Sequence, residues 1–225
     1  MILCLETSAK ACSVAISSEG QTLVHKIEEG EWRHSQIITL LIQDVLSTQS
    51  VHLSDLQAVA ISQGPGSYTG LRVGASCAKG LCYALDIPLI SVPTLELVAF
   101  PFTAAAKSGQ KIIPMIDARR QEVYYNIYDA ELNAGIETTN LVLDDSSFKA
   151  YEDKTIIFCG DGAHKMRDLV PKEADWMINP SIPQAKDMAA LAYDRYKAGK
   201  LEDTAYYVPF YLKPPNITKS KKPLF

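Results

Sequence analysis

Three segments within the first 30 residues combine β-forming residues with patterns of period two, which is typical of β-strands. We expect three strands there, over residues 2–7, 11–17 and 21–28. Residues 56–62, LQAVAIS, are almost uninterruptedly apolar, which is typical of a strand covered on both faces in a parallel sheet. A further short strand is expected at residues 88–92.

Between and after these strands the apolar residues recur every three or four positions, which predicts helices over residues 35–47, 69–85 and 94–105. The second half of the chain begins again with strand-like patterns. We expect strands at residues 111–117, 122–129 and 155–159, a short helix after the GDG sequence at 160–162, and a helix within 183–199.

Each half therefore opens with a pair of strands, the first of which ends in an acid, Glu6 or Asp117. A repeated β-β-β-α-β-α-β order is typical of the actin-like and sugar-kinase class. We expect a two-domain α/β protein with residues 1–105 in one domain and 106–225 in the other, divided near the AKSGQ sequence. The basic, proline-rich stretch from Lys213 is expected to be mobile.

The GPGSYTG loop at residues 64–70 lies between a predicted strand and a predicted helix. Its spacing matches neither GxxxxGK[ST] nor GxGxxG, so a sharp turn into the helix is favoured over a phosphate site. Gly66, Gly70, Gly74 and Ala78 recur every four residues and form a shallow ridge. Glycine costs roughly 0.5–1 kcal/mol in a helix, so this ridge indicates close approach of another element, within the chain or from a partner. If a partner docks there, a bulky residue at Gly74 blocks it and leaves the monomer folded.

The first predicted helix is apolar over more of its surface than one contact requires. On a helical wheel its apolar residues cover roughly 240°, interrupted only by Asp44, whereas a one-sided surface helix needs a stripe of about 100°. We expect this helix to be covered on two sides, once by its own sheet and once by another helix of this chain or of a second chain.

Composition limits the partners and the cellular compartment that we expect for the chain. The formal net charge is −4, so no overall field attracts nucleic acid. The five cysteines form no CxxC motif, as is usual for reduced thiols of a cytoplasmic protein. No signal peptide and no apolar stretch of about 20 residues is present, so we expect a cytoplasmic chain without a membrane span.

Signs of catalysis are weak. The four histidines lack the three-to-five-residue spacing of a helical metal site, and GxSxG is absent. Glu6 and Asp117 end strands at the places where actin-like ATPases hold Mg²⁺-associated acids, but the adjoining SAK and ARRQ turns lack phosphate-gripping glycines. We expect an enzyme fold without an evident enzyme site, and neither a metal nor a cofactor. Glu6 and Asp117 are then a vestigial nucleotide site.

Five segments together resemble the TsaB (YeaZ) family over nearly the whole chain: ILCLETSAKACSVAIS, HSQIITLLIQDVL, QGPGSYTGLRVG with a following AKGL, IDARRQEVYY and PFYLK. The resemblance implies an actin-like (ASKHA, ribonuclease H-like) fold with duplicated mixed-sheet halves. It also implies a catalytically silent subunit that binds the TsaD transferase, with the ATPase TsaE, in making threonylcarbamoyladenosine beside the tRNA anticodon. Contact with tRNA is then indirect, through the complex, and the chain can also form a homodimer.

In the family, two helices of the first domain form a four-helix bundle with the partner. Carried over here, they are the helices at residues 35–46 and 69–85. The expected interface residues are Ile38, Leu41, Ile42, Val45, Gly70, Arg72, Val73, Gly74, Cys77, Ala78 and Leu81. The chain departs from the family pattern at three positions, with Glu6 for the commoner Asp, Tyr68 for Phe and Lys213 for Arg.

Two other classes of function stay open from the sequence. One is an enzyme of the same fold, either metallopeptidase-like or a nucleotide hydrolase that uses Glu6 and Asp117. The other is a stable homodimer with a role of its own. Nucleotide binding to the isolated chain separates the first from a binding subunit, and sedimentation with and without TsaD separates the second.

Overall fold

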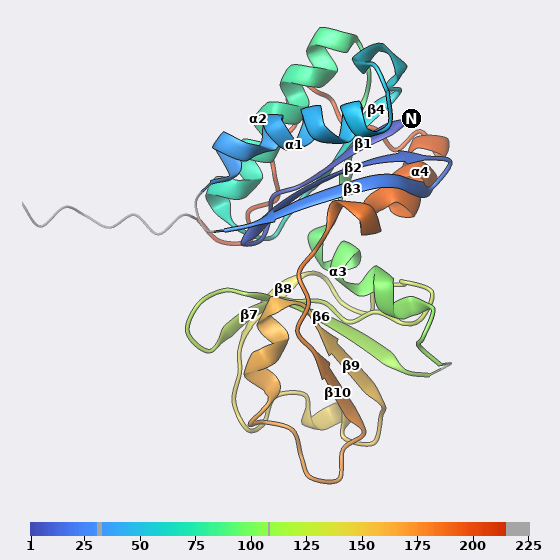
Figure 1. The fold of residues 1–225 in the computed structure, drawn as a ribbon. Helices are drawn as coiled ribbons and strands as arrows, with labels where there is room; N and C mark the ends of the chain where they lie inside the picture. Colours follow the sequence, from blue (N-terminus) through green and yellow to red (C-terminus); the bar gives the residue numbers. More distant parts are fainter. Residues whose placement is uncertain (31–32, 108, 215–225) are drawn as a thin grey trace, which may run out of the picture.

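The computed structural model describes residues 1–30, 33–107 and 109–214, and it contains two five-stranded sheets (Figure 1). The first sheet contains β1 (Ile2–Glu6), β2 (Ala11–Ser18), β3 (Gln21–Glu29), β4 (Ala58–Ser62) and β5 (Leu89–Val92). The second contains β6 (Lys111–Asp117), β7 (Glu122–Tyr125), β8 (Thr139–Val142), β9 (Ile156–Cys159) and β10 (Trp176–Asn179). The α-helices are α1 (His34–Thr48), α2 (Tyr68–Leu85), α3 (Thr94–Thr103) and α4 (Ala189–Lys197). The 3₁₀ helices are η1 (Leu53–Asp55), η2 (Lys149–Tyr151), η3 (Asp161–Met166) and η4 (Ala185–Met188).

The two sheets have the same topology. Their orders are β3-β2-β1-β4-β5 and β8-β7-β6-β9-β10. In each, the first three strands are antiparallel neighbours, and the last two run parallel to the first. The duplicated α/β fold is confirmed. The division into domains at residue 105 stays a prediction, although the strands of the two sheets do separate between α3 and β6.

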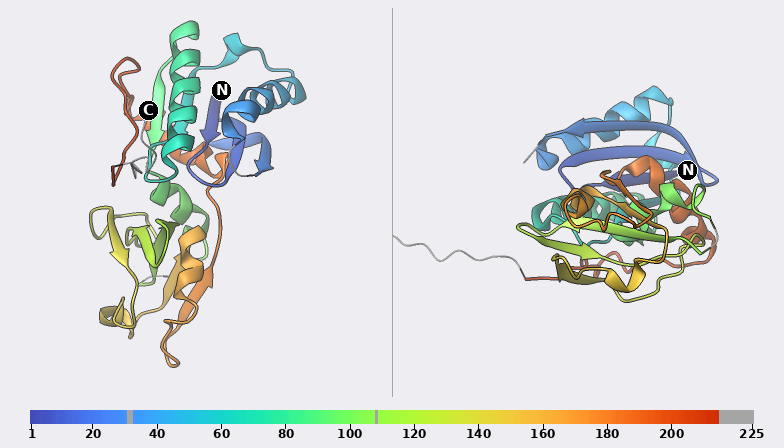
Figure 2. Two further views of the ribbon diagram at one scale, coloured as in Figure 1. Left: turned by 90° about the vertical axis from the view of Figure 1, so that its left-hand side faces the viewer. Right: turned by 90° about the horizontal axis from the view of Figure 1, so that it is seen from below.

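The helices lie in layers around the sheets. Helices α1 and α2 cover the face of the first sheet that points away from the second sheet, and α3 and α4 lie between the two sheets (Figures 1 and 2). Helix α3 follows a strand of the first sheet yet packs on β6 and β9, whereas α4 follows the second sheet and packs on β1, β2 and β5. This exchange joins the halves through buried apolar surface on both sides of the inner helices.

Strand β1 shows how the sequence pattern supports this layering. Leu3 and Leu5 belong to the core cluster under α1 and α2, whereas Ile2 and Cys4 belong to the cluster with η4 and α4. Both faces of the strand are buried, so its nearly continuous apolar sequence is explained by helices on both sides of the sheet. No described helix is long and apolar enough to cross a membrane.

The expected elements are present, with four differences. Strand β7 ends at Tyr125, and Tyr128 forms only isolated bridges, with Ile112 and with Ala134. The expected helix within 183–199 begins as the 3₁₀ turn η4. Strands β8 and β10 were not predicted, because each is partly exposed and is defined by pairing with a distant strand, whereas β5 and β9, of the same length, are fully buried apolar runs.

After α4 the chain returns along the first sheet. The Glu202 amide donates to the carbonyl of Leu89 on β5, and the Phe210 amide donates to the carbonyl of Gln63. Tyr207 is buried in the core cluster beneath α1 and α2. Lys213 then pairs with Glu122 of β7, so residues 200–213 contact both sheets. The rest of the stretch expected to be mobile, residues 215–225, lies outside the described residues.

Candidate functional site

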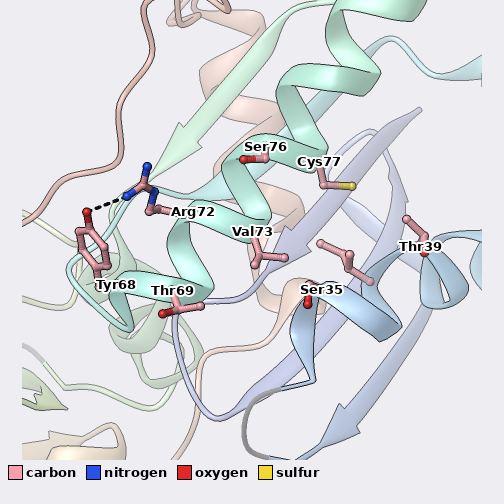
Figure 3. Close-up of a pocket in the computed structure, with 9 residues that line it drawn as sticks. Ser35, Thr39, Tyr68, Thr69, Arg72, Val73, Ser76 and Cys77 are labelled. Carbon is pink, nitrogen blue, oxygen red and sulfur yellow. Dashed lines mark hydrogen bonds between the residues drawn. The ribbon is translucent and has the colours of Figure 1, made fainter. Parts of the chain in front are cut away.

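A shallow groove separates α1 from α2 on the outer surface of the first half (Figure 3). It has a volume of about 670 Å³ and is mostly apolar. Helix α1 contributes Ser35, Ile38 and Thr39, and the remaining lining side chains come from the first half of α2. We call this feature the α1–α2 groove. Both helices that the family resemblance selects therefore meet at one open surface.

The stripe formed by Gly66, Gly70, Gly74 and Ala78 does not face this groove. A Cβ atom on Gly70 would lie 2.0 Å from the carbonyl oxygen of Thr7, and one on Gly74 would lie 2.3 Å from Thr7 Oγ1. Ala78 is fully buried. The stripe lets α2 approach the β1–β2 turn of its own chain, so the close approach that the glycines indicated is intramolecular. A bulky residue at Gly74 would strike Thr7, which argues against the expectation that such a variant stays folded; that expectation stays a prediction.

A second stripe of small residues on α2 points outward. Ser76 lines the groove, and Gly80 and Ala84 follow at one-turn intervals and are exposed. A Cβ atom added to Gly80 would meet no atom within 4 Å. No close contact within the described residues accounts for this glycine. We call Ser76, Gly80 and Ala84 the outer stripe.

The expected interface residues on α1 are mostly buried inside the chain. Ile38, Ile42 and Val45 belong to the first core cluster, and Leu41 is half-buried against it. The broad apolar surface of α1 is used largely within the fold, because the helix packs on β2, β3 and α2. Leu40 is the exception, with 61% of its surface exposed.

The expected residues on α2 that lie outside the buried inner stripe divide into two groups. Val73, Cys77 and Leu81 are half-buried, and the first two line the groove. Arg72 is exposed, and its guanidinium donates to the hydroxyl of Tyr68 at 2.8 Å and lies over the Tyr68 ring. Tyr68 in turn contacts the Tyr211 ring, with 4.8 Å between ring centroids. Arg72 is thus held at the groove rim by a pair of aromatic rings.

A separate cavity of about 630 Å³ lies between the two halves. One wall is formed by the SAK turn and the GPGSYTG loop. The other is formed by Asp117 and Arg119 at the β6–β7 turn and by Asp161 at the start of η3. The segment from Phe210 to Pro214 closes one side. This is the cavity in which the two strand-ending acids were expected to meet.

Glu6 does not reach that cavity. The carboxyl group is completely buried, and its Oε1 accepts hydrogen bonds from the amide and the hydroxyl of Ser8, both at 2.5 Å. Its Oε2 has no hydrogen-bond partner among the described residues. Burial raises the pKa of Glu6 above its ordinary value, although the Ser8 hydrogen bonds oppose the shift. The Ser8 turn, onto which Gly66 packs, covers the carboxyl group.

Asp117 does line the cavity, but its carboxylate is already paired. Lys165 Nζ lies 2.6 Å from Asp117 Oδ1 and also donates to the carbonyl of Glu122 at 2.9 Å. The Arg119 amide donates to the same carboxylate oxygen. Burial alone would raise the pKa of Asp117, but these donors outweigh burial and hold the pKa below its ordinary value.

These two acids do not fit the Mg²⁺ of an actin-like ATPase. A magnesium ion needs exposed carboxylate oxygens with room for several waters. Glu6 is enclosed by its own chain, and an ammonium group already lies against Asp117. Among the described residues no group of three or more histidines, cysteines or acids could hold a metal ion.

Sequence reasoning missed two features of these sites. The outer stripe has the same four-residue spacing as the inner one, so its signal was present, but spacing does not say which stripe faces the core. Lys165 and Lys213 gave no local signal, because their partners Asp117 and Glu122 lie 48 and 91 positions away in the chain.

The fold places the chain in the actin-like class of duplicated α/β proteins. The chain superposes on component A of the (R)-2-hydroxyglutaryl-CoA dehydratase of Acidaminococcus fermentans with a TM-score of 0.55. The superposition covers 87% of this chain and 98% of that protein, and the two sequences are 9% identical. At that identity the likeness concerns the fold alone.

Three closer similarities identify the family. The model of the family described as "TsaD: tRNA N6-adenosine threonylcarbamoyltransferase" matches residues 28–213. The tRNA threonylcarbamoyladenosine biosynthesis protein TsaB of Escherichia coli is 32% identical over 99% of this chain and 98% of its own. YeaZ from Pseudomonas aeruginosa is 27% identical and superposes over 94% of this chain and 99% of its own, with a TM-score of 0.81. The chain belongs to the TsaB (YeaZ) family, as its motifs predicted.

Proposed function

We propose that this chain is a non-catalytic subunit for the formation of threonylcarbamoyladenosine on tRNA. Its role is to bind a TsaD-type transferase through the α1–α2 groove and the outer stripe, with TsaE as a further member of the complex. The modified adenosine lies next to the anticodon, and tRNA contacts this chain only through the complex. The names of the similar proteins support the pathway, and the surface of α2 supports the binding role.

The observation that carries this proposal is Gly80. A glycine inside a helix costs roughly 0.5–1 kcal/mol relative to alanine, and the inner glycines offset that cost by packing on Thr7. Gly80 has open space around it, and none of the described residues provides such compensation. A helix of a partner that lies across the outer stripe would approach most closely at this residue, as small residues allow in tight helix pairs.

The groove next to Gly80 supplies the remaining contacts. Val73 and Cys77 offer half-buried apolar surface, and Leu40 of α1 adds an exposed side chain on the same half of the molecule. Arg72 stands at the rim, where its charge can pair with an acid of the partner. Apolar surface framed by polar and charged groups is the usual composition of a protein interface.

Gly80→Leu tests this proposal. Because the added side chain enters open space, the variant should unfold at the native midpoint or slightly above it, yet fail to co-purify with the TsaD-type transferase. Threonylcarbamoyladenosine should stay low when Gly80→Leu is the sole copy in a strain depleted of the native chain. The matched control is Gly80→Ala, which adds one methyl group and should retain binding within about threefold, less than 1 kcal/mol.

A folded Gly80→Leu chain that binds the transferase and restores modification contradicts the proposed interface. A second copy of this chain could occupy the same surface. Sedimentation of the native chain with and without the transferase measures whether the two compete for it. If one surface serves both, the homodimer should dissociate as the transferase is added.

A further inference from the structure

Lys165 lies where a cation bound to Asp117 would lie. Its side chain is only 6% exposed, and its ammonium group touches Asp117 Oδ1 at 2.6 Å and the carbonyl oxygen of Glu122 at 2.9 Å. A carboxylate and a backbone carbonyl are oxygen ligands of the kind that hard cations bind. The lysine reaches this pair of oxygens from η3, immediately after β9.

The neighbouring acidic side chains favour a positive charge at the position of the Lys165 ammonium group. Asp161 approaches from the start of η3, where its Oδ1 accepts the Asp117 amide at 2.9 Å. The carboxylate of Glu122 accepts from Asn140 at 2.6 Å and pairs with Lys213. Two acids at this end of the second sheet are therefore each paired with a lysine: Asp117 with the buried Lys165, and Glu122 with Lys213 of the C-terminal segment.

We propose that Lys165 is a built-in cation that replaces the divalent metal at this end of the cleft. Its ammonium group neutralises Asp117 and occupies the space that a metal ion and its waters would need. A divalent ion entering there would have to displace a buried, paired ammonium group, and the two like charges would repel at short range. The inference does not depend on the proposed partner surface, because Lys165, Asp117 and Glu122 belong to β6, β7 and η3 of the second half, whereas that surface is formed by α1 and α2.

Glu6, the equivalent strand-end acid of the first sheet, is consistent with this inference. Its carboxyl group lies under Ser8 and is closed to solvent. Neither of the two acids at equivalent strand ends therefore presents a free carboxylate to the cavity. Asp117 is the one whose carboxylate would become available if its lysine partner were removed.

A titration with Mn²⁺ alone tests this proposal. The native chain should show no Mn²⁺ binding that depends on Asp117. Lys165→Met, which keeps the length of the side chain and removes its charge, should bind Mn²⁺ at least about tenfold more tightly, through the vacated oxygens. The matched control is Lys154→Met, which removes an exposed lysine paired with Asp153 in the same half and should leave Mn²⁺ binding unchanged.

Two results overturn the proposal. One is Mn²⁺ binding by the native chain that Asp117→Asn abolishes, and the other is a folded Lys165→Met chain with no gain in Mn²⁺ affinity.

If Lys165→Met does not fold, amine labelling of the native chain decides instead. Lys165 should be modified at least about tenfold more slowly than Lys154 in the native chain, and should become reactive in Asp117→Asn. Equal labelling rates of Lys165 and Lys154 in the native chain contradict a buried, paired ammonium group and overturn the proposal.

Discussion

Helix α2 carries two stripes of small residues that differ in what lies next to them. The inner stripe, Gly66, Gly70, Gly74 and Ala78, is closed by Thr7 and Ser8 of the same chain. The outer stripe, Ser76, Gly80 and Ala84, is exposed, and no side chain or strand in the described part of the chain approaches its glycine. The same four-residue spacing thus serves internal packing on one side of the helix and leaves the other side open.

The difference between the stripes shows how glycine should be interpreted in a helix. At Gly70 the missing Cβ is what allows the helix to touch the strand end, so the glycine is explained by the fold. At Gly80 the fold gives no reason for the residue, and an explanation has to come from outside the described chain. The comparison therefore predicts opposite responses to one substitution at two positions of one helix.

The largest effect is expected at the inner stripe. Gly70→Ala places a Cβ atom 2.0 Å from the Thr7 carbonyl oxygen, a backbone atom that cannot move without shifting β1. We expect a loss of about 3 kcal/mol or more in the free energy of unfolding, as for overpacked cores in which neither side can relax. Urea unfolding at one pH measures this loss. A change below about 1 kcal/mol would mean that α2 and the β1–β2 turn separate easily, and the two stripes would then not differ in kind.

The second effect concerns the acid that the inner stripe encloses. Because Glu6 is buried and its pKa is raised, the folded chain holds this proton to a higher pH than the unfolded chain does. As the pH rises above the ordinary value of 4.5, the unfolded state releases the proton first, and the free energy of unfolding falls until the folded-state pKa is passed. Glu6→Gln removes this titration, so its stability relative to the native chain should increase with pH above 4.5 and be constant below it.

Unfolding midpoints in urea, measured for both chains between pH 4 and pH 8, provide this comparison. Acids with lowered pKa values, such as Asp117, titrate in the same way in both chains and cancel in the difference. If the difference in stability between Glu6→Gln and the native chain does not change with pH, then water reaches the Glu6 carboxyl group and the inner stripe does not exclude water from it.

Much of the fold could be predicted from the sequence, because its strands carry strong local patterns. The β-forming residues of β1 and β2, the apolar run of β4 and the repeated strand-plus-acid opening were sufficient for the duplicated topology. Strands β8 and β10 escaped prediction because they are partly exposed and lack the buried apolar run of β5, which has the same length, so their neighbours specify them. The return of residues 200–213 to the first sheet is likewise set by distant partners such as Leu89 and Glu122.

The candidate site was less predictable, because the sequence does not show which face of a helix points toward the core. The sequence selected two helices that do meet at one groove, but it chose the stripe that packs inside the chain, since a wheel shows which residues share a face and not what covers that face. It also placed Glu6 and Asp117 together as a vestigial nucleotide site. The structure buries Glu6 and pairs Asp117 with a lysine that no motif connects to it.

The smallest effect has the opposite sign and lies on the outer stripe. Gly80→Ala adds a methyl group where no atom lies within 4 Å, so it introduces no clash and reduces the freedom of the unfolded chain. The free energy of unfolding should therefore rise by about 0.5–1 kcal/mol. Urea unfolding measures this gain, at a concentration where sedimentation shows a monomer so that self-association does not contribute. A loss instead of a gain would mean that Gly80 already has a close neighbour in the free chain, and its openness would no longer point to a partner.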